Sequence, residues 1–181
     1  MKPARLLRLA CALGVISLLP SLACAQLADE RAVKAAFVFN LTKYVEWLHP
    51  SQELIVGVND DGPTAQTLKE VLDGRNSESR PIRVLLFPSD AQLEQCNILY
   101  VGHSSPKKWR AVLDRVRNKS ILTVRDSDSF AQDGGIVGLV TAGDHIQIQV
   151  NLVAASEAHL KISSRLLNLS TIVQPTREVR H

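Results

Sequence analysis

The sequence is poor in the residues that mark specialised protein classes. Its 181 residues include three cysteines, one methionine, four Phe, two Trp and two Tyr. So few cysteines exclude a disulfide-rich scaffold, and an apolar content of 45% excludes a disordered chain. There is no repeat and no low-complexity stretch, which excludes collagen-like and coiled-coil proteins. The composition is therefore that of an ordinary globular protein.

The sequence also lacks an excess of charge once its first residues are set apart. Lys2, Arg5 and Arg8 precede the first acidic residue, Asp29. Removing these three cations from the 21 basic residues leaves 18 basic against 18 acidic side chains. A neutral chain lacks the broad positive surface that nucleic acid or anionic lipid requires. We therefore expect no nucleic-acid partner.

No apolar run is long enough to span a bilayer. The run from Leu9 to Leu19 has about 11 residues, whereas a membrane-spanning helix needs about 20. It follows a basic start and precedes Ala23-Cys24-Ala25, which is the layout of an export signal. We predict that residues 1–25 are a signal peptide and that residues 26–181 form a single periplasmic domain.

The cysteines provide no pair for an intramolecular disulfide. Cys11 and Cys24 precede the predicted cleavage site, which leaves Cys96 alone in the exported chain. We interpret Cys96 as a small buried residue at the start of a strand; the alternative is a bridge between two chains. A second alternative is lipidation of Cys24, whose preceding residues loosely resemble a lipoprotein signal but have Ser21 where that signal has Leu.

The spacing of apolar residues alternates between helix and strand along the chain. A three- and four-residue spacing predicts a first helix over residues 29–48, ended by His49-Pro50. The β-rich runs that follow are separated by two further helical patterns. The expected strands are 54–58, 80–87, 98–101 and 120–124, and the expected helices are 63–72 and 106–117.

The C-terminal third does not continue the alternation of helices and strands. Residues 136–141 and 145–150 are separated by three residues, a length that favours an antiparallel hairpin of two edge strands. Asn151 is expected to cap a helix that runs to about His159, and an apolar stripe continues to Ile172. The predicted fold is an α/β three-layer sandwich with a mostly parallel sheet and a C-terminal antiparallel hairpin.

Motifs that carry chemistry are scarce. The five histidines have no zinc-site spacing, and one cysteine does not complete a thiolate site. The acidic run over residues 126–135 has Phe130 and Ala131 where a calcium loop needs an oxygen ligand and a glycine, so we interpret it as a solvated turn. No nucleophile elbow, P-loop or dinucleotide fingerprint is present. We predict no metal, no cofactor and no enzymatic activity.

One loop has features of a small-anion site. Gly102, His103, Ser104 and Ser105 follow a predicted strand, and Pro106 opens a predicted helix, so free backbone N–H groups point into the loop. The alternative interpretation is an ordinary capped helix start. A ligand in this loop would make the protein a periplasmic small-ligand receptor or accessory protein, which is the alternative function.

An ordered set of segments resembles a known family. The segments are Ala35–Trp47, Cys96–Val101, Leu122–Asp126, Phe130-Ala131 with Gly134-Gly135, and Asn151-Leu152 with Ile162–Leu167. Together they span nearly all of the exported chain, and in this order they resemble the YfiR-like periplasmic family.

The resemblance implies a regulatory function. The best-known members are periplasmic repressors that bind the periplasmic domain of an inner-membrane diguanylate cyclase of the YfiN type, which restrains cyclic di-GMP synthesis and biofilm formation. An outer-membrane lipoprotein of the YfiB type relieves the restraint by sequestering the repressor. The resemblance also implies a homodimer and, in some members, disulfides. This chain lacks those cysteines around Gly57 and at Ala131 and Gly138.

Five residues are candidates for binding the partner. Tyr44 and Trp47 are three residues apart near the end of the predicted first helix, so we expect them to share a face. Arg165 interrupts the apolar C-terminal stripe, and aromatic residues with Arg are typical interface anchors. Gln149 and Asn151 are polar neighbours that complete the predicted patch. The alternative is that both aromatics belong to the core and Arg165 extends to solvent.

Overall fold

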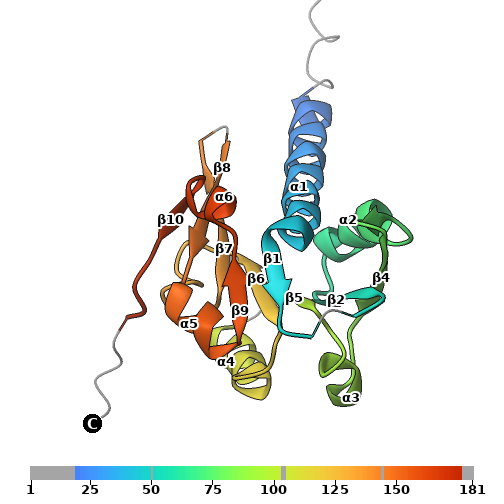
Figure 1. Ribbon diagram of the computed structural model, residues 1–181. Coiled ribbons are helices and arrows are strands. Elements are labelled where there is room, and N and C mark those ends of the chain that lie inside the picture. Colours follow the sequence, from blue (N-terminus) through green and yellow to red (C-terminus); the bar gives the residue numbers. More distant parts are fainter. Residues whose placement is uncertain (1–18, 50, 103–104, 144, 177–181) are drawn as a thin grey trace, which may run out of the picture.

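The computed structural model describes residues 19–49, 51–102, 105–143 and 145–176. Within these residues, an eight-stranded sheet has the order β10-β8-β7-β6-β5-β2-β4-β3 (Figure 1). Strands β4, β2, β5, β6 and β7 run parallel to one another, and β7 pairs antiparallel with β8. The strands are β2 (Leu54–Asn59), β3 (Asn76–Ser77), β4 (Arg80–Leu86), β5 (Ile98–Val101), β6 (Leu122–Asp126), β7 (Val137–Ala142), β8 (His145–Val150) and β10 (Ser170–Ile172).

Helices cover both faces of this sheet, as the sequence predicts for a three-layer α/β sandwich. The helices are α1 (Leu19–Tyr44), α2 (Pro63–Leu72), α3 (Asp90–Leu93), α4 (Pro106–Val116), α5 (Leu152–Glu157) and α6 (Ser164–Leu167). A separate antiparallel pair, β1 (Val45–Trp47) with β9 (Leu160–Ile162), lies beside the sheet (Figure 1).

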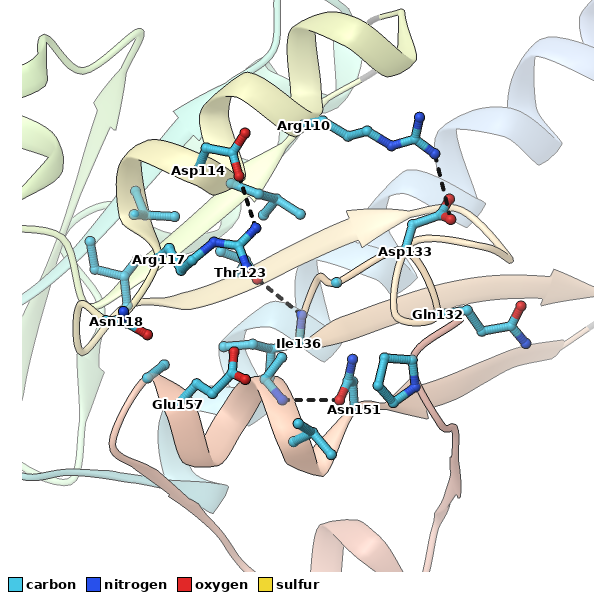
Figure 2. Close-up of a pocket in the computed structure, with 18 of the residues that line it drawn as sticks. Arg110, Asp114, Arg117, Asn118, Thr123, Gln132, Asp133, Ile136, Asn151 and Glu157 are labelled. Carbon is cyan, nitrogen blue, oxygen red and sulfur yellow. Dashed lines mark hydrogen bonds and ion pairs between the residues drawn. The ribbon is translucent and has the colours of Figure 1, made fainter. Parts of the chain in front are cut away.

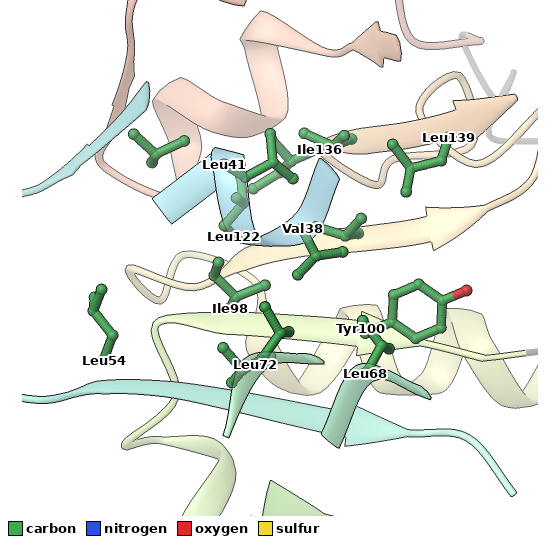
Figure 3. Packing of buried hydrophobic residues seen from close by; sticks show 14 of the residues in the cluster. Val38, Leu41, Leu54, Leu68, Leu72, Ile98, Tyr100, Leu122, Ile136 and Leu139 are labelled. Atoms are coloured by element: carbon green, nitrogen blue, oxygen red, sulfur yellow. The ribbon is translucent and has the colours of Figure 1, made fainter. Parts of the chain in front are cut away.

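Strand alternation divides the core into two clusters, because successive side chains point to opposite faces of a sheet. The larger cluster joins Val56 and Tyr100 of the strands to α1, α2, α5 and the β1–β9 pair (Figure 3). The smaller cluster joins Ile55 and Leu99 to Trp109 of α4 and to α3. The Trp109 ring meets the Phe130 ring edge-on, with 5.6 Å between centroids. Each face of the parallel strands is therefore buried, as continuous apolar runs require.

The first helix ends earlier than its sequence pattern predicts. Helix α1 stops at Tyr44, and Val45 pairs with Ile162 in the β1–β9 ladder. Lys34 lies on the buried side of α1, whereas Val33, one of the apolar residues with the helical spacing, is exposed. Leu48, the last apolar residue with that spacing, is exposed as well. The prediction of a helix to residue 48 is wrong because residues 45–47 pair with the distant strand β9 instead of continuing the helix.

The predicted hairpin is present, but its strands are not at the edge. β7 and β8 pair antiparallel from Val137 opposite Val150 to Ala142 opposite His145. β10 then adds parallel to β8, with Thr171 opposite Gln149. The sequence pattern did not reveal this strand because its three residues follow an apolar stripe with helical spacing.

The described residues contain no helix that is both long and apolar enough to cross a membrane. Residues 1–18, most of the predicted signal peptide, lie outside the described ranges, and the predicted cleavage after Ala25 falls within α1.

Candidate functional site

A cleft opens at the end of the sheet where β6 and β7 begin. It has a volume of about 560 Å³ and lies between α4, the turn before β7, α5 and the C-terminal segment (Figure 2). Leu113 of α4, Ile136 before β7 and Val153 of α5 supply apolar walls. A backbone hydrogen bond of 2.9 Å from Thr176 to the carbonyl of Gln132 fixes the C-terminal segment at the rim. The volume is in the range of small-molecule sites.

Asn151 positions three of the segments that border the cleft. Its Nδ2 donates to the carbonyl of Ala131 at 2.7 Å, and its Oδ1 accepts from the backbone N–H of Ala154 at 3.0 Å. Its own backbone N–H donates to the carbonyl of Ile136 at 2.9 Å. The predicted helix cap is thus confirmed, and the same side chain ties α5 to the turn before β7. Asn151 is fully buried, so its contacts hold the segments that border the cleft in place.

The rim of the cleft is charged but locally balanced. The Arg110 guanidinium lies 3.6 Å from the Asp133 carboxylate, and Arg117 lies 2.9 Å from Asp114 (Figure 2). Glu157 of α5 also lines the cleft, and no ion pair joins it to another described residue. Exposed pairs of this kind contribute little to stability. They give the cleft mixed charge rather than a field of one sign.

Ser163 joins the segments that carry Tyr44 and Arg165 by hydrogen bonds to both. The backbone N–H of Ser163 donates to the carbonyl of Tyr44 at 2.8 Å, and the Ser163 hydroxyl accepts from the backbone N–H of Arg165 at 3.2 Å. Arg165 is exposed on α6, and its guanidinium makes no ion pair with a described residue. Tyr44 is half-buried at the end of α1. The two side chains therefore lie on neighbouring elements, α1 and α6.

Trp47 and Gln149 lie elsewhere. Trp47 is in β1 rather than on the helix, so the prediction that it shares a helical face with Tyr44 is wrong. It is 7% exposed, and its indole N–H donates to the carbonyl of Asn97 at 3.1 Å. Gln149 of β8 points to the opposite face from the core residue Ile148. The five predicted binding residues therefore do not form one continuous patch.

The predicted anion loop is described only at its two ends. His103 and Ser104 lie outside the described residues, whereas Ser105 precedes α4 and Pro106 begins it, as predicted. At Gly102, an added Cβ would lie 2.2 Å from Asp60 Oδ1, so the Asp60 carboxylate lies against this backbone. The Arg125 guanidinium donates to the carbonyl of Gly102, so a carboxylate and a cation both lie beside this end of the loop.

The buried Lys34 meets two half-buried carboxylates at the opposite end of the sheet, where β2, β5 and β6 finish. The Lys34 ammonium lies 2.5 Å from both Glu30 Oε1 and Asp126 Oδ2. Burial alone would lower the pKa of Lys34, but the hydrogen bonds to Asp126 and Glu30 outweigh it and raise that pKa. The bond from Lys34, and then one from Thr141, lowers the pKa of Glu30. Helix α1 is thereby joined to β6 by ionic contacts.

Tyr100 and Arg125 complete this group. Burial raises the pKa of the Tyr100 phenol well above its usual value, and the nearby Asp126 and Asp60 raise it further. The Arg125 guanidinium is buried, donates to the carbonyl of Gly102 and lies 5.6 Å from the Trp109 ring. Burial lowers the pKa of Arg125, and the opposing Tyr100 and carboxylates limit that shift.

Comparison with known proteins shows the family. Residues 31–171 match the sequence pattern of the family described as YfiR/HmsC-like. The chain belongs to the YfiR/HmsC-like family. Members of this family are periplasmic regulators of diguanylate cyclase signalling, and the family is regulatory rather than catalytic.

Other comparisons add little to the YfiR/HmsC-like assignment. No curated protein matches the sequence. Among solved structures, the chain is similar to an ABC domain in complex with L-Trp from Streptococcus pneumonia, at 9% identity and a TM-score of 0.49. The alignment covers 67% of this chain and 55% of that one, so the chain spans about half the length of that structure.

Sequence patterns do not reveal the residues at the carboxyl end of the sheet. Asp60 lies two residues after the predicted strand 54–58, and Lys34 carries a charge on the buried side of α1. A weak signal exists, because Asp60, Gly102 and Asp126 each lie one or two residues after a predicted strand. Carboxyl ends of parallel strands meet at one edge, where ligand sites of α/β folds form.

Proposed function

We propose that this YfiR/HmsC-like chain is a periplasmic negative regulator that binds the periplasmic domain of an inner-membrane diguanylate cyclase. Binding restrains cyclic di-GMP synthesis and biofilm formation. The observation that carries the proposal is the family match over residues 31–171, which includes nearly all of the sheet and its covering helices. An outer-membrane lipoprotein of the YfiB type and a second copy of this chain are the further partners that the proposal includes.

The C-terminal region supports recognition of a protein. Four of its large apolar side chains are exposed: Leu152, Val153, Leu169 and Ile172. Leu169 is 74% exposed, and it follows the short helix α6 that presents Arg165. Exposed apolar residues beside an unpaired arginine are typical of interface anchors, since burying them against a partner is favourable. We place the partner surface on α6 and β10, with Tyr44 at its border.

The proposed partner surface does not need all five predicted residues to make contact. Trp47 and Asn151 are buried, and each makes hydrogen bonds within the domain, so their role is to hold α1, the β1–β9 pair and α5 in place. Arg165 is the residue of the set that is free to pair with a partner carboxylate. The proposal therefore assigns contact to Arg165 and Tyr44, support to Trp47 and Asn151, and neither role to Gln149.

Binding is tested with the purified protein and the purified periplasmic domain of a membrane diguanylate cyclase from the same organism. We expect Arg165→Ala to weaken binding by about 1 to 3 kcal/mol, the usual loss at a desolvated anchor. Arg115→Ala is the matched control, because Arg115 is an exposed arginine of α4 that pairs with Asp90 at 3.1 Å, away from α6. Equal affinity of wild type and both variants would reject the assigned surface, and no binding by wild type would reject this partner.

The second candidate function is a periplasmic small-ligand receptor. The observation that favours it is the cleft of about 560 Å³ between α4 and α5, which differs from the predicted Gly102–Pro106 loop. A thermal-shift panel of small metabolites separates the two functions. Stabilisation by a metabolite with no binding to any cyclase domain would favour the receptor.

A further inference from the structure

The two edges of the eight-stranded sheet differ in how they are covered. At one edge, β3 has two residues and lies against α1, where Thr42 donates a hydrogen bond of 2.7 Å to the buried Ser77 hydroxyl. At the other edge, β10 pairs with β8 on one side, and no strand within residues 19–49, 51–102, 105–143 and 145–176 pairs with its other side (Figure 1). An open edge presents backbone N–H and C=O groups to which a further strand can add.

The ladder with β8 determines which backbone groups of β10 face outward. The N–H of Val173 donates to the carbonyl of Val150 at 2.9 Å, so the N–H of Val173 faces β8. Because backbone groups alternate between the two sides of a strand, those of Thr171 face β8 as well, whereas those of Ser170 and Ile172 face away from the sheet. Each residue has one N–H and one C=O group, so the outer edge offers two donors and two acceptors.

The sequence of β10 leaves this edge open to a partner strand. Natural proteins block open edges with charged residues, proline, bulges or a covering element, and Ser170-Thr171-Ile172 contains neither a charged residue nor a proline. The strand has three residues, and a short edge by itself supports little pairing. An added strand therefore needs further contacts beside β10, which makes the edge selective for a partner that provides them.

The two faces of β10 specify the side chains that fit beside it. Ile172 lies next to Val150, which belongs to the larger core cluster, and Ile172 is 48% exposed. Leu166 of α6 belongs to the same cluster, so α6 and Ile172 are on one face of the sheet. On the opposite face, Thr171 Oγ1 accepts a hydrogen bond of 3.0 Å from Gln147 Nε2. A strand that fits this edge has apolar side chains on the α6 side and polar side chains on the other.

Charge beside β10 adds a further requirement. Arg165 of α6 is exposed, and its guanidinium makes no ion pair with a residue of the described ranges. Leu169, between α6 and β10, is 74% exposed. A segment that is uncharged along β10 and carries a carboxylate next to it complements both the strand and the arginine.

We propose that an extended segment of the periplasmic domain of the diguanylate cyclase adds to the sheet as a strand along the outer edge of β10, an inference that rests on the proposed function. The added strand pairs its backbone with Ser170 and Ile172. It covers Ile172 and Leu169 with apolar side chains and presents a carboxylate to Arg165. In this mode of recognition the backbone hydrogen bonds provide affinity and the side chains provide specificity.

Amide hydrogen exchange tests the pairing on the wild-type protein without any substitution. Exchange is measured residue by residue by NMR, for the free protein and for its complex with the purified periplasmic domain of a membrane diguanylate cyclase from the same organism. We expect the N–H groups of Ser170 and Ile172 to exchange at least about tenfold more slowly in the complex, because they become hydrogen-bonded. The N–H groups of Thr171 and Val173 face β8, so they are the internal control and should be protected in both states.

A matched pair of variants at one position isolates the backbone donor. Ile172→Pro removes the outward N–H but none of the hydrogen bonds to β8, and proline is tolerated on an edge strand at such a position. We expect Ile172→Pro to bind the cyclase domain about tenfold more weakly or worse, because a carbonyl of the added strand loses its donor. Ile172→Val keeps the N–H and a branched apolar side chain, so it should bind within about twofold of wild type. Circular dichroism confirms that both variants fold.

The outcomes separate this inference from the proposed function. If wild type binds the cyclase domain but the exchange of Ser170 and Ile172 is unchanged in the complex, the added strand is overturned and the proposed function stands. Equal binding by folded Ile172→Pro and Ile172→Val has the same meaning. If Ile172→Pro does not fold, the exchange measurement decides alone. No binding by wild type would reject the proposed function and this inference with it.

Discussion

The two ends of the parallel sheet differ in whether their buried polar groups are hydrogen-bonded. At the amino end, the Asn151 side chain is buried with both its donor and its acceptor paired, and Thr123 Oγ1 accepts from the backbone N–H of Ile136 at 3.0 Å. At the carboxyl end, Asp60 Oδ2 and the Tyr100 hydroxyl are buried and have no hydrogen-bond partner in the described part of the chain. Fully paired buried groups hold a fold together, whereas unpaired ones reduce its stability.

The largest expected loss of stability is at the amino end of the sheet, where the buried polar groups are hydrogen-bonded. Asn151→Ala removes the α5 cap and leaves the Ala131 carbonyl and the Ala154 N–H without partners, so we expect a loss of about 3 kcal/mol in the free energy of unfolding. Urea unfolding measures this loss. Asn168→Ala, at an exposed asparagine whose side chain makes no hydrogen bond with described residues, is the control and should change stability by less than about 0.5 kcal/mol. Equal losses would mean that the Asn151 contacts do not hold this end of the sheet.

A smaller loss is expected when the ionic contact at the other end is broken. Lys34→Met leaves Asp126 and Glu30 without their shared cation, and we expect a loss of about 2 kcal/mol at pH 7. The raised pKa of Lys34 and the lowered pKa of Glu30 set the pH window. The Glu30 carboxylate stabilises the fold when the pH is above its unfolded pKa of 4.5. This stabilisation is lost as the pH falls through its lower folded pKa. Lys34 contributes below its unfolded value of 10.5, and this is lost as the pH rises through its higher folded pKa.

Unfolding of Lys34→Met across pH therefore checks the contact. The difference from wild type should be constant between about pH 5 and pH 10 and should shrink outside that range. A difference that does not vary with pH would show that Lys34 acts through the packing of its aliphatic chain instead.

Removing the unpaired Tyr100 hydroxyl should raise the free energy of unfolding or leave it unchanged, rather than lower it. Tyr100→Phe removes a buried polar group that has no partner among the described residues, so we expect no loss and up to about 1 kcal/mol of added stability. Chemical unfolding measures the difference in the free energy of unfolding. A loss above about 1 kcal/mol would show that the hydroxyl is already hydrogen-bonded and would remove the contrast between the two ends.

The smallest effect is expected at Cys96. Its thiol is buried, and burial raises its pKa to about 11, so it stays protonated at neutral pH. It has no partner cysteine among the described residues, so reductant should leave the melting temperature unchanged. A drop of several degrees would indicate a bridge between two chains.

Sequence periodicity predicted the elements that bury a continuous apolar run. Strands β2 and β5, helix α4 with Pro106 at its start, and the Asn151 cap all follow from local pattern and capping chemistry. β1 and β10 did not, because each has three residues and forms only when a distant strand pairs with it. Short strands of this kind have no periodic signal of their own.

The candidate sites were less predictable for a related reason. Tyr44 and Arg165 were chosen by residue type, and only the β1–β9 pairing and Ser163 show that they lie on neighbouring elements. Asp60 lies against Gly102, which in turn accepts a hydrogen bond from Arg125, and no local pattern encodes these tertiary contacts.

Restraint of a diguanylate cyclase is tested most directly by cyclic di-GMP measured in a strain that lacks the gene. Deletion should raise cyclic di-GMP and surface attachment, because loss of an inhibitor releases its target. The wild-type gene should restore the original level, and the Arg165→Ala variant, secreted to an equal amount, should restore it only in part. Unchanged cyclic di-GMP after deletion would contradict the proposed function.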